Sequence, residues 1–312
     1  MYVRMTGRAI INIHTANAEG AIGNYVSLSK AFIARRLPNG GLEYFEEPVI
    51  SGNMLKHWHA VETINILKSL NYDKLCEYCK RYVMYRSPLK FDDEFEYIRN
   101  CAIEDLHGFL STEANIRRES LVRFSFMVPV EDLESKYVAI THNRVGITKK
   151  GKIDDDIMMV FKREYATGLY GFSVSLDLSY VGRSQSDPSK VLNLNERRVR
   201  AKAALQALAN VLTGNFGASR VRAEPIIKVI ELIAVASNKP IPNLIHGFYK
   251  DYVNDSKSLL ESLRKMEHVG KDLKIYVLGD EVAKTLGDLA IKCRDIVDLI
   301  SKLIEDVDRW LT

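Results

Sequence analysis

Apolar residues recur at three- and four-residue steps between Ile50 and Leu70, and this period is typical of an amphipathic helix. The members of the series are Met54, Trp58, Val61, Ile64, Leu67 and Leu70. Ser51 or Asn53 can cap the first turn by accepting a hydrogen bond from a backbone N–H group. Lys56, His57 and His59 belong to the same turn. Unpaired N–H groups, the helix dipole and a lysine together predict a phosphate site, or else the solvated start of a core helix.

Strict alternation over residues 3–14 predicts a half-buried strand. Its inner face carries Val3, Met5, Ala9, Ile11 and Ile13, and its outer face carries Arg4, Thr6, Arg8, Asn12 and His14. Residues 14–24 follow as a loop of small residues, whose glycines allow a ligand to approach the backbone closely. The turn Pro38-Asn39-Gly40-Gly41 then predicts a hairpin before the helix.

The later segments complete an α+β pattern. They are a strand over 119–130, two strands over 157–181 joined around 166–168, a helix from about Asn195 to a cap at Gly214, and a buried strand over 225–236. The core order is strand, helix, strand, strand, helix, strand. This order predicts an RRM-like or ferredoxin-like core, a split βαβ unit with an antiparallel sheet.

Two insertions and a C-terminal extension complete the predicted domain organisation. The core takes residues 1–70 and 119–236, with a helical insertion at 71–118 and a flexible, poorly apolar loop at 131–156. This long loop either grips an anionic chain or is a solvated hairpin. Residues 237–312 form a helical extension packed on the core. Within it we expect a helix near 256–267, a strand at 273–278 and one long amphipathic helix from Leu286 to Leu311.

Composition excludes few functions. The net charge is +4 with a pI of about 8.7, so a basic surface must come from clustering of its cations. The 312-residue chain has no apolar run of membrane-spanning length, and its N-terminus lacks the apolar core of a signal peptide. We therefore expect a cytoplasmic protein without a membrane partner.

Catalytic and cofactor motifs are missing from the sequence. The glycine-rich turn 214–219 lacks the lysine of a P-loop, and there is neither a Rossmann fingerprint nor a nucleophile elbow. The loop after the first strand offers a single carboxylate, Glu19, for metal-dependent hydrolysis. The sequence thus predicts no cofactor, but an acid–base ribonuclease that uses His14, His57, His59 or His142 stays open.

Four residues of the insertion have zinc-ligand chemistry. Cys76 and Cys79 are spaced Cys-x-x-Cys, and Cys101 and His107 follow. Thiolate and imidazole are the ligands that zinc prefers, but one short-spaced pair is half a signature. The sequence predicts a reduced, metal-free cysteine pair, with zinc at these four residues as the alternative.

Four segments resemble a known family. They are Ile50-Ser51-Gly52-Asn53-x-x-Lys56, Asp105-Leu106-His107-Gly108-Phe109-Leu110, Arg118-x-Ser120-Leu121-Val122-x-Phe124-Ser125-Phe126 and Gly214-x-Phe216-Gly217-Ala218-Ser219. In order and spacing the set resembles the DevR branch of the RAMP superfamily, in particular the CRISPR RNA-binding backbone subunits of archaeal type I-A Cascade. The likeness spans about residues 1–236 and is weaker in the C-terminal helices.

This resemblance implies a palm, the RRM-like core, and a thumb, residues 131–156. It implies copies that polymerise along single-stranded CRISPR RNA, bind other Cascade subunits and present the guide to target DNA without chemistry of their own. The RNA-binding candidates are Arg8, Asn12, His14, Asn17, Ser51, Gly52, Asn53, Lys56, His57, Arg123, His142, Arg144, Lys149, Lys150 and Arg220. The alternatives are a ribonuclease acting on CRISPR RNA, a DevR-like regulator reading duplex DNA, and a scaffold whose C-terminal helix recruits a protein.

Overall fold

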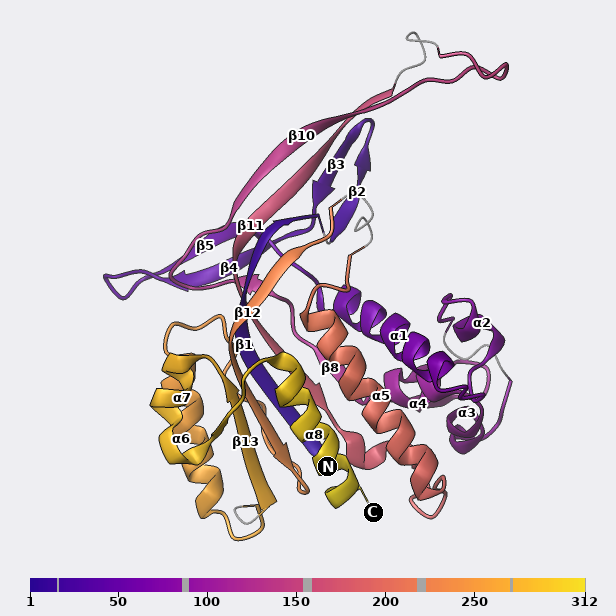
Figure 1. Ribbon diagram of the computed structural model, residues 1–312, viewed down its shortest axis with the longest axis vertical. Helices are drawn as coiled ribbons and strands as arrows, with labels where there is room; N and C mark the ends of the chain where they lie inside the picture. The colour runs from indigo at the N-terminus through magenta and orange to yellow at the C-terminus, as the bar shows by residue number, and fades with distance from the viewer. Residues whose placement is uncertain (16, 86–89, 154–158, 218–222, 270–271, 312) are drawn as a thin grey trace.

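The computed structural model describes residues 1–15, 17–85, 90–153, 159–217, 223–269 and 272–311, and it has an α+β architecture (Figure 1). A large sheet forms around the N-terminal strand, which pairs antiparallel with a neighbour on each side. Its central strands, in spatial order, are β13 (Leu273–Leu278), β12 (Ile226–Ser237), β1 (Tyr2–His14), β11 (Met159–Leu176) and β8 (Val122–Phe124). The short strands β14 (Ile291–Lys292) and β9 (Val128–Pro129) pair with β13 and β11.

Helices cover both faces of this sheet (Figure 1). On one face lie α1 (Gly52–Ser69), α5 (Leu194–Leu212) and α8 (Ile296–Trp310), and on the other lie α6 (Tyr252–Lys265) and α7 (Asp280–Leu286). Successive residues of β12 alternate between the two cores, as the pleat requires: Ala234 packs toward the first and Val235 toward the second. The first half of β1 is consequently buried on both sides, and the predicted half-exposed strand is wrong there, since Arg4 and Thr6 are buried.

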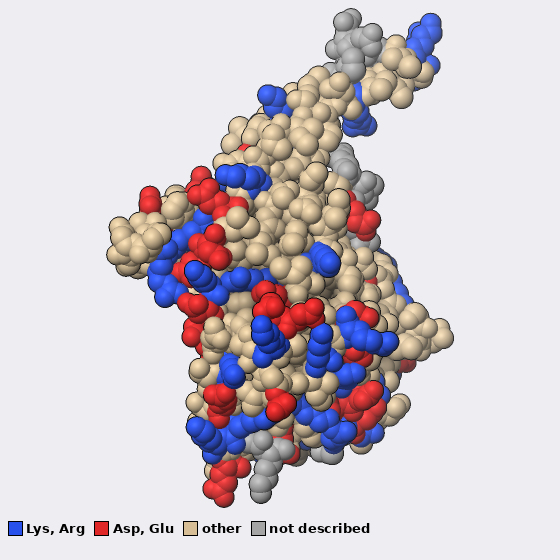
Figure 2. Space-filling view, turned by 60° about the vertical axis from the view of Figure 1, so that its left-hand side comes forward, with Lys and Arg blue, Asp and Glu red and all other residues tan. Residues whose placement is uncertain are grey.

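Hairpins project from one end of the sheet, as Figure 1 shows. Their strands are β2 (Ala18–Ile22), β3 (Tyr25–Leu28), β4 (Lys30–Arg36), β5 (Leu42–Pro48) and β10 (Lys136–Arg144), which pairs with the first half of β11. The β4–β5 hairpin confirms the prediction from the Pro38–Gly41 turn. Two other predictions are wrong, because the two strands expected over 157–181 are one long strand, β11, and the loop expected over 14–24 contains β2. Residues 131–156, expected as a flexible loop or a solvated hairpin, contain β10. Figure 2 shows the β10–β11 projection as largely uncharged, with scattered lysines and arginines.

The insertion mixes helices with a small hairpin. Its elements are α2 (Glu77–Lys80), α3 (Glu94–Asn100), α4 (Ala102–His107), β6 (Phe109–Ser111) and β7 (Ile116–Arg118). Figure 1 places it beside α1 and α5, and its apolar residues share a core with both helices. The insertion was predicted to be purely helical, but it also contains the β6–β7 hairpin.

The C-terminal extension is partly sheet. The predicted strand 273–278 is confirmed as β13, and α6 confirms the helix expected near 256–267. The single long helix is wrong, because the chain turns at Gly287 with φ of 54° and then forms the 3₁₀ turn η4 (Gly287–Leu289) and β14. Asp295 caps a new helix by accepting from the Asp298 N–H at 2.8 Å. Among the described residues, none of the helices has both the length and the apolarity that crossing a bilayer requires.

Two glycines, Gly247 in the loop and Gly171 in the sheet, let the loop lie directly on the sheet. A Cβ on Gly247 would lie 2.1 Å from the carbonyl O of Gly7 in β1, and a Cβ on Gly171 in β11 would lie 2.2 Å from the N of Phe248. Such distances exclude any side chain. Thr6 Oγ1 also donates to the Ile245 carbonyl at 2.8 Å. The segment before α6 is thus fixed across β1 and β11.

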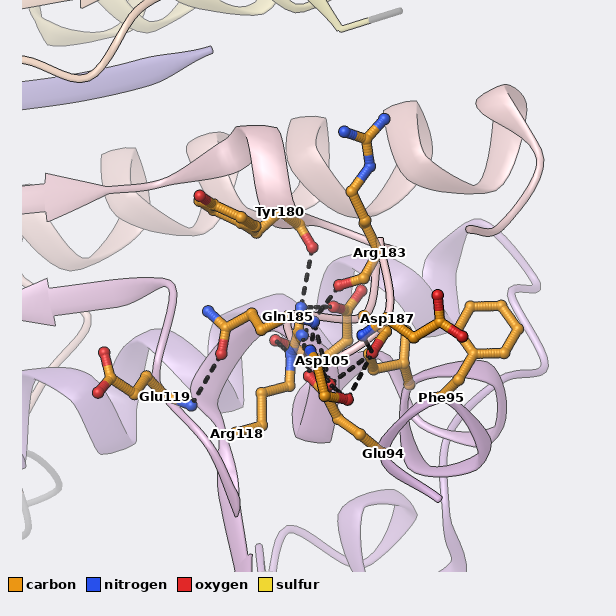
Figure 3. A network of polar contacts seen from close by, with 12 residues as sticks. Glu94, Phe95, Asp105, Arg118, Glu119, Tyr180, Arg183, Gln185 and Asp187 are labelled. Atoms are coloured by element: carbon orange, nitrogen blue, oxygen red, sulfur yellow. Dashed lines mark hydrogen bonds and ion pairs between the residues drawn. The ribbon is translucent and has the colours of Figure 1, made fainter. Parts of the chain in front are cut away.

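A buried ion network joins the insertion to the rest of the molecule (Figure 3). The Arg118 guanidinium bonds Asp105 at 2.6 Å and Glu94 at 2.7 Å, and Arg200 of α5 bonds the other Asp105 oxygen at 2.8 Å. All four side chains are at most 3% exposed. Arg118 also donates to the carbonyls of Tyr180 and Arg183, and the Gly182 N–H donates to Asp105. Each buried charge is therefore paired and hydrogen-bonded.

Replacing Arg118 with Ala should lower the free energy of unfolding by about 3–5 kcal/mol, because it leaves buried carboxylates short of their partner. Arg118→Lys should rescue little, since an ammonium cannot reproduce the guanidinium fork. Urea unfolding followed by circular dichroism measures the change. Arg117→Ala is the matched control, because the neighbouring Arg117 is exposed. Equal stability of the two alanine variants would contradict this role of the network.

Ionisation of Glu94 should make the stability of the fold depend on pH. Burial acts to raise the pKa of Glu94, but hydrogen bonds from Ser184, Ser186 and Gln185 outweigh it and lower this pKa from 4.5 to about 2. Its stabilising contribution is therefore complete above pH 4.5 and is lost as the pH falls toward 2. Thermal unfolding of wild type and Glu94→Gln across this window measures the effect. The wild-type midpoint should fall more steeply with acid, and parallel curves would contradict the assignment.

Candidate nucleic-acid interface

The start of α1 is held by polar contacts to the segment before β2. Ser51 Oγ accepts from the Met54 N–H at 3.2 Å, which confirms the predicted cap. The same hydroxyl donates to Asn17 Oδ1 at 2.7 Å, and the Asn17 amide donates to Ser29 Oγ. Both polar groups of Asn17 thus have partners within the chain. Asn17 fixes the helix start rather than presenting a bare amide to a ligand.

Gly52 is needed for packing of the helix on β8. A Cβ at this position would lie 2.3 Å from the carbonyl O of Phe124. Gly52 is buried, so the prediction that it offers its backbone to RNA is wrong. The close backbone approach that the glycine permits is made to the sheet instead.

The next turn of α1 lines a surface hollow of about 530 Å³. Asn53, Lys56 and His57 form one wall, and Asn53 and His57 are exposed. The insertion supplies the remaining lining, which includes Val83, Met84, His107, Gly108, Phe109, Leu110, Arg118 and Ser120. The structure therefore brings three of the predicted site residues together in a concave site with cationic, amide and apolar groups.

His14 is not at the surface. The register of β1 against β11 shifts between Ile11 and His14, and Ile13 adopts φ of 51°. This irregularity turns Ile13 outward, at 51% exposure, and His14 inward, at 1%. His14 Nε2 lies 2.9 Å from the Tyr170 hydroxyl, and burial lowers the pKa of His14 to about 4. The predicted RNA contact of His14 is wrong, because its ring belongs to the core.

The two arginines predicted on the palm have partners within the chain. Arg8 donates to the carbonyls of Gly247 at 2.8 Å and Tyr249 at 2.9 Å, so it holds the C-terminal segment. The exposed Arg123 pairs with Asp177 and donates to the Ser120 carbonyl. Asn12 is exposed near the end of β1. The bonds of Arg8 give it a structural role, and the RNA contacts of these three residues stay predictions.

The β10–β11 hairpin carries the remaining cations. Arg144 at the end of β10 and Lys149 and Lys150 in the tip are exposed. His142 Nε2 lies 2.7 Å from the Tyr165 hydroxyl, and its ring stacks on Phe161, so it braces the hairpin. Arg220 lies outside the described residues. Figure 1 shows the tip far from the start of α1, so the two sets of candidates do not form one continuous surface within a chain.

An apolar hollow at the base of this hairpin was missed by the sequence analysis. It measures about 170 Å³ and is lined by Ile13, Lys136, Tyr137, Val138, Ile140, Tyr165 and Thr167. Ile13 was assigned to the inner face, and only the shift in register exposes it. The two-residue spacing of Val138 and Ile140 within a supposed loop is a weak signal, but it was the available one for a strand with an apolar face.

The zinc candidates are only partly brought together. The ligand atoms of Cys76, Cys79 and Cys101 all lie within 4.8 Å of one another. His107 instead lies 3.1 Å from His59, between their ring nitrogens, and is not part of the thiol group. The predicted fourth ligand is therefore wrong.

A family model and several curated proteins match most of this chain. Residues 5–257 match the family model described as CRISPR-associated negative auto-regulator DevR/Csa2. A CRISPR-associated protein Cas7/Cst2/DevR of Methanocaldococcus jannaschii is 41% identical, covering 98% of this chain and 99% of its own. A protein of the same description from Thermoproteus tenax is 37% identical, covering 95% of this chain and 92% of its own. A CRISPR-associated aCascade subunit Cas7/Csa2 of Saccharolobus solfataricus is 26% identical, covering 96% of this chain and 98% of its own.

Solved structures share the fold. A chain of a CRISPR RNA-guided surveillance complex superposes with a TM-score of 0.56 at 12% identity, covering 98% of this chain and 100% of that chain. A chain of a pre-nicking form of such a complex superposes with a TM-score of 0.57 and the same coverage. At this identity the match concerns the architecture alone. The family model and the full-length relatives show that the chain belongs to the DevR/Csa2 family of CRISPR-associated proteins.

Proposed function

We propose that this chain is a non-catalytic backbone subunit of a type I-A Cascade complex, which polymerises along CRISPR RNA and presents it for pairing with target DNA. The observation that carries the proposal is the end-to-end match to Cas7/Csa2 relatives, one of which is described as an aCascade subunit. The partners are then guide RNA, further copies of the chain and other Cascade subunits.

The order of the strands supports an RRM-like palm. Strands β12, β1, β11 and β8 are neighbours, and α1 and α5 pack on the same face of the sheet. A β-α-β-β-α-β chain with this arrangement is a ferredoxin-like core. In this proposal the palm holds RNA at the loop edges around the start of α1.

The separation between the helix start and the hairpin tip suits a filament. The hollow beside α1 offers Asn53, Lys56 and His57, whereas Arg144, Lys149 and Lys150 extend on the hairpin. In the proposed filament, the hairpin of one copy contributes its cations and its exposed apolar side chains to the RNA on the palm of the next. Phosphates then bind the lysines and arginines, and bases contact apolar surface without being read.

The histidine geometry supports a role without catalysis. Among the ribonuclease candidates, His14 and His59 are buried, and burial lowers the pKa of each to about 4. His142 is stacked and bonded within the hairpin. His57 is the exposed candidate, and an acid–base mechanism needs a second group poised beside it.

A second candidate function follows from the description of the family. The matching model is named for a negative auto-regulator, which would bind duplex DNA. Preference for single-stranded RNA over a duplex of the same sequence, measured by competition, distinguishes the two functions.

A purified chain that carries RNA and leaves a labelled CRISPR repeat intact in EDTA supports the backbone role. Defined cuts would instead support a ribonuclease.

Binding to single-stranded RNA should weaken steeply with salt. If about five phosphates are neutralised per chain, log affinity falls against log salt with a slope of about −3.5. Replacing both Lys149 and Lys150 with Ala should reduce this slope by about 1.4, and should do so equally for unrelated RNA sequences. Fluorescence anisotropy over a range of salt concentrations gives both slopes.

The matched control for this experiment is Lys265→Ala with Lys284→Ala. It removes the same charge from exposed positions on α6 and α7, away from the hairpin. The control should keep the wild-type slope. A loss of affinity as large as that of the hairpin variant would mean that net charge, and not the hairpin, determines binding.

A further inference from the structure

Three cysteines of the insertion meet although they come from separate elements. Cys76 is the N-cap residue of α2, Cys79 lies within α2, and Cys101 joins α3 to α4. They are 7%, 1% and 0% exposed, respectively. All three side chains are free thiols, and the fourth cysteine, Cys293, is buried elsewhere in the core beneath α8.

We propose that Cys76, Cys79 and Cys101 form a structural zinc site that fastens α2 to the junction of α3 and α4. Their sulfur atoms lie within 4.8 Å of one another. A tetrahedral ion with Zn–S bonds of about 2.3 Å needs sulfur atoms about 3.8 Å apart. Shifts of about 1 Å or less would therefore bring the three sulfurs into coordination distance.

The local bonding favours a negatively charged sulfur at this place. The Cys79 N–H donates to Cys76 Sγ at 3.5 Å. A bound cation would complete this stabilisation for all three sulfurs, and their protons would pass to solvent as the metal binds.

The surroundings select the kind of ion. The cluster lies among apolar side chains of α1, α5 and the insertion, among them Ile64, Leu67, Ile103 and Ala203. A thiolate set in apolar surroundings suits zinc and excludes magnesium or calcium, which require oxygen ligands. With His107 bonded to His59, three protein ligands leave one tetrahedral position for a small exogenous ligand.

A redox pair explains the cluster less well. A Cys-x-x-Cys disulfide would use Cys76 and Cys79 and would leave the third thiol without a role. The convergence of Cys101 from 22 residues further along the chain is what a metal site requires. Zinc would fix the segment that leads to Val83 and Met84, which line the same hollow as Lys56.

The test uses the reduced, metal-free full-length chain titrated with Co²⁺ and then with Zn²⁺. Wild type should develop sulfur-to-cobalt charge-transfer bands and tetrahedral d–d bands, both of which zinc abolishes. Mass spectrometry of metals should find about one zinc ion per chain after expression in zinc-supplemented medium. Cys76→Ser and Cys101→Ser should each lose the charge-transfer intensity and retain less zinc.

Cys293→Ser is the matched control, because it also removes a buried thiol but lies outside the cluster. It should keep the wild-type cobalt spectrum. Absence of the bands in wild type, or equal loss of the bands in the control, would each overturn the proposal. If the serine variants fail to fold, the wild-type spectrum and zinc content decide it by themselves.

Discussion

The contact between the Arg118 guanidinium and the Asp105 carboxylate determines how the rest of the molecule assembles. Both side chains are fully buried, and each would be strongly unfavourable without the other. Arg118 comes from the insertion hairpin, its carbonyl acceptors from the turn after β11, and Arg200 from α5. These contacts, together with the apolar core that the insertion shares with α1 and α5, join the insertion to the rest of the fold.

The same contact shapes the candidate interface. Arg118 lines the hollow beside α1, and the hairpin that carries it supplies part of the opposite wall. The Ser51 cap and the close packing of Gly52 on Phe124 fix the first turn of α1, and the ion network fixes the hairpin that also lines the hollow. Such rigidity lowers the ordering cost that a flexible loop would meet on binding.

Local chemistry explains which features could be predicted from sequence. The Ser51 cap, α1, the β4–β5 hairpin and β13 depend on short-range patterns, and the structure confirms them. The inward turn of His14 depends on a register shift against a strand about 150 residues away, and the pairing of Asp105 with Arg200 spans 95 residues. The break in the C-terminal helix at Gly287 was hidden because apolar spacing continues across it.

The loop that passes over Gly7 and Gly171 has a consequence for any nucleic acid. An RRM stacks bases on aromatic side chains at the open centre of its sheet. In this molecule the corresponding part of the sheet is covered by residues 245–249 and by α6 and α7. Where the loop crosses Gly7 and Gly171, the gap is too small for a methyl group. A strand bound to this molecule would therefore have to lie outside this covered part of the sheet.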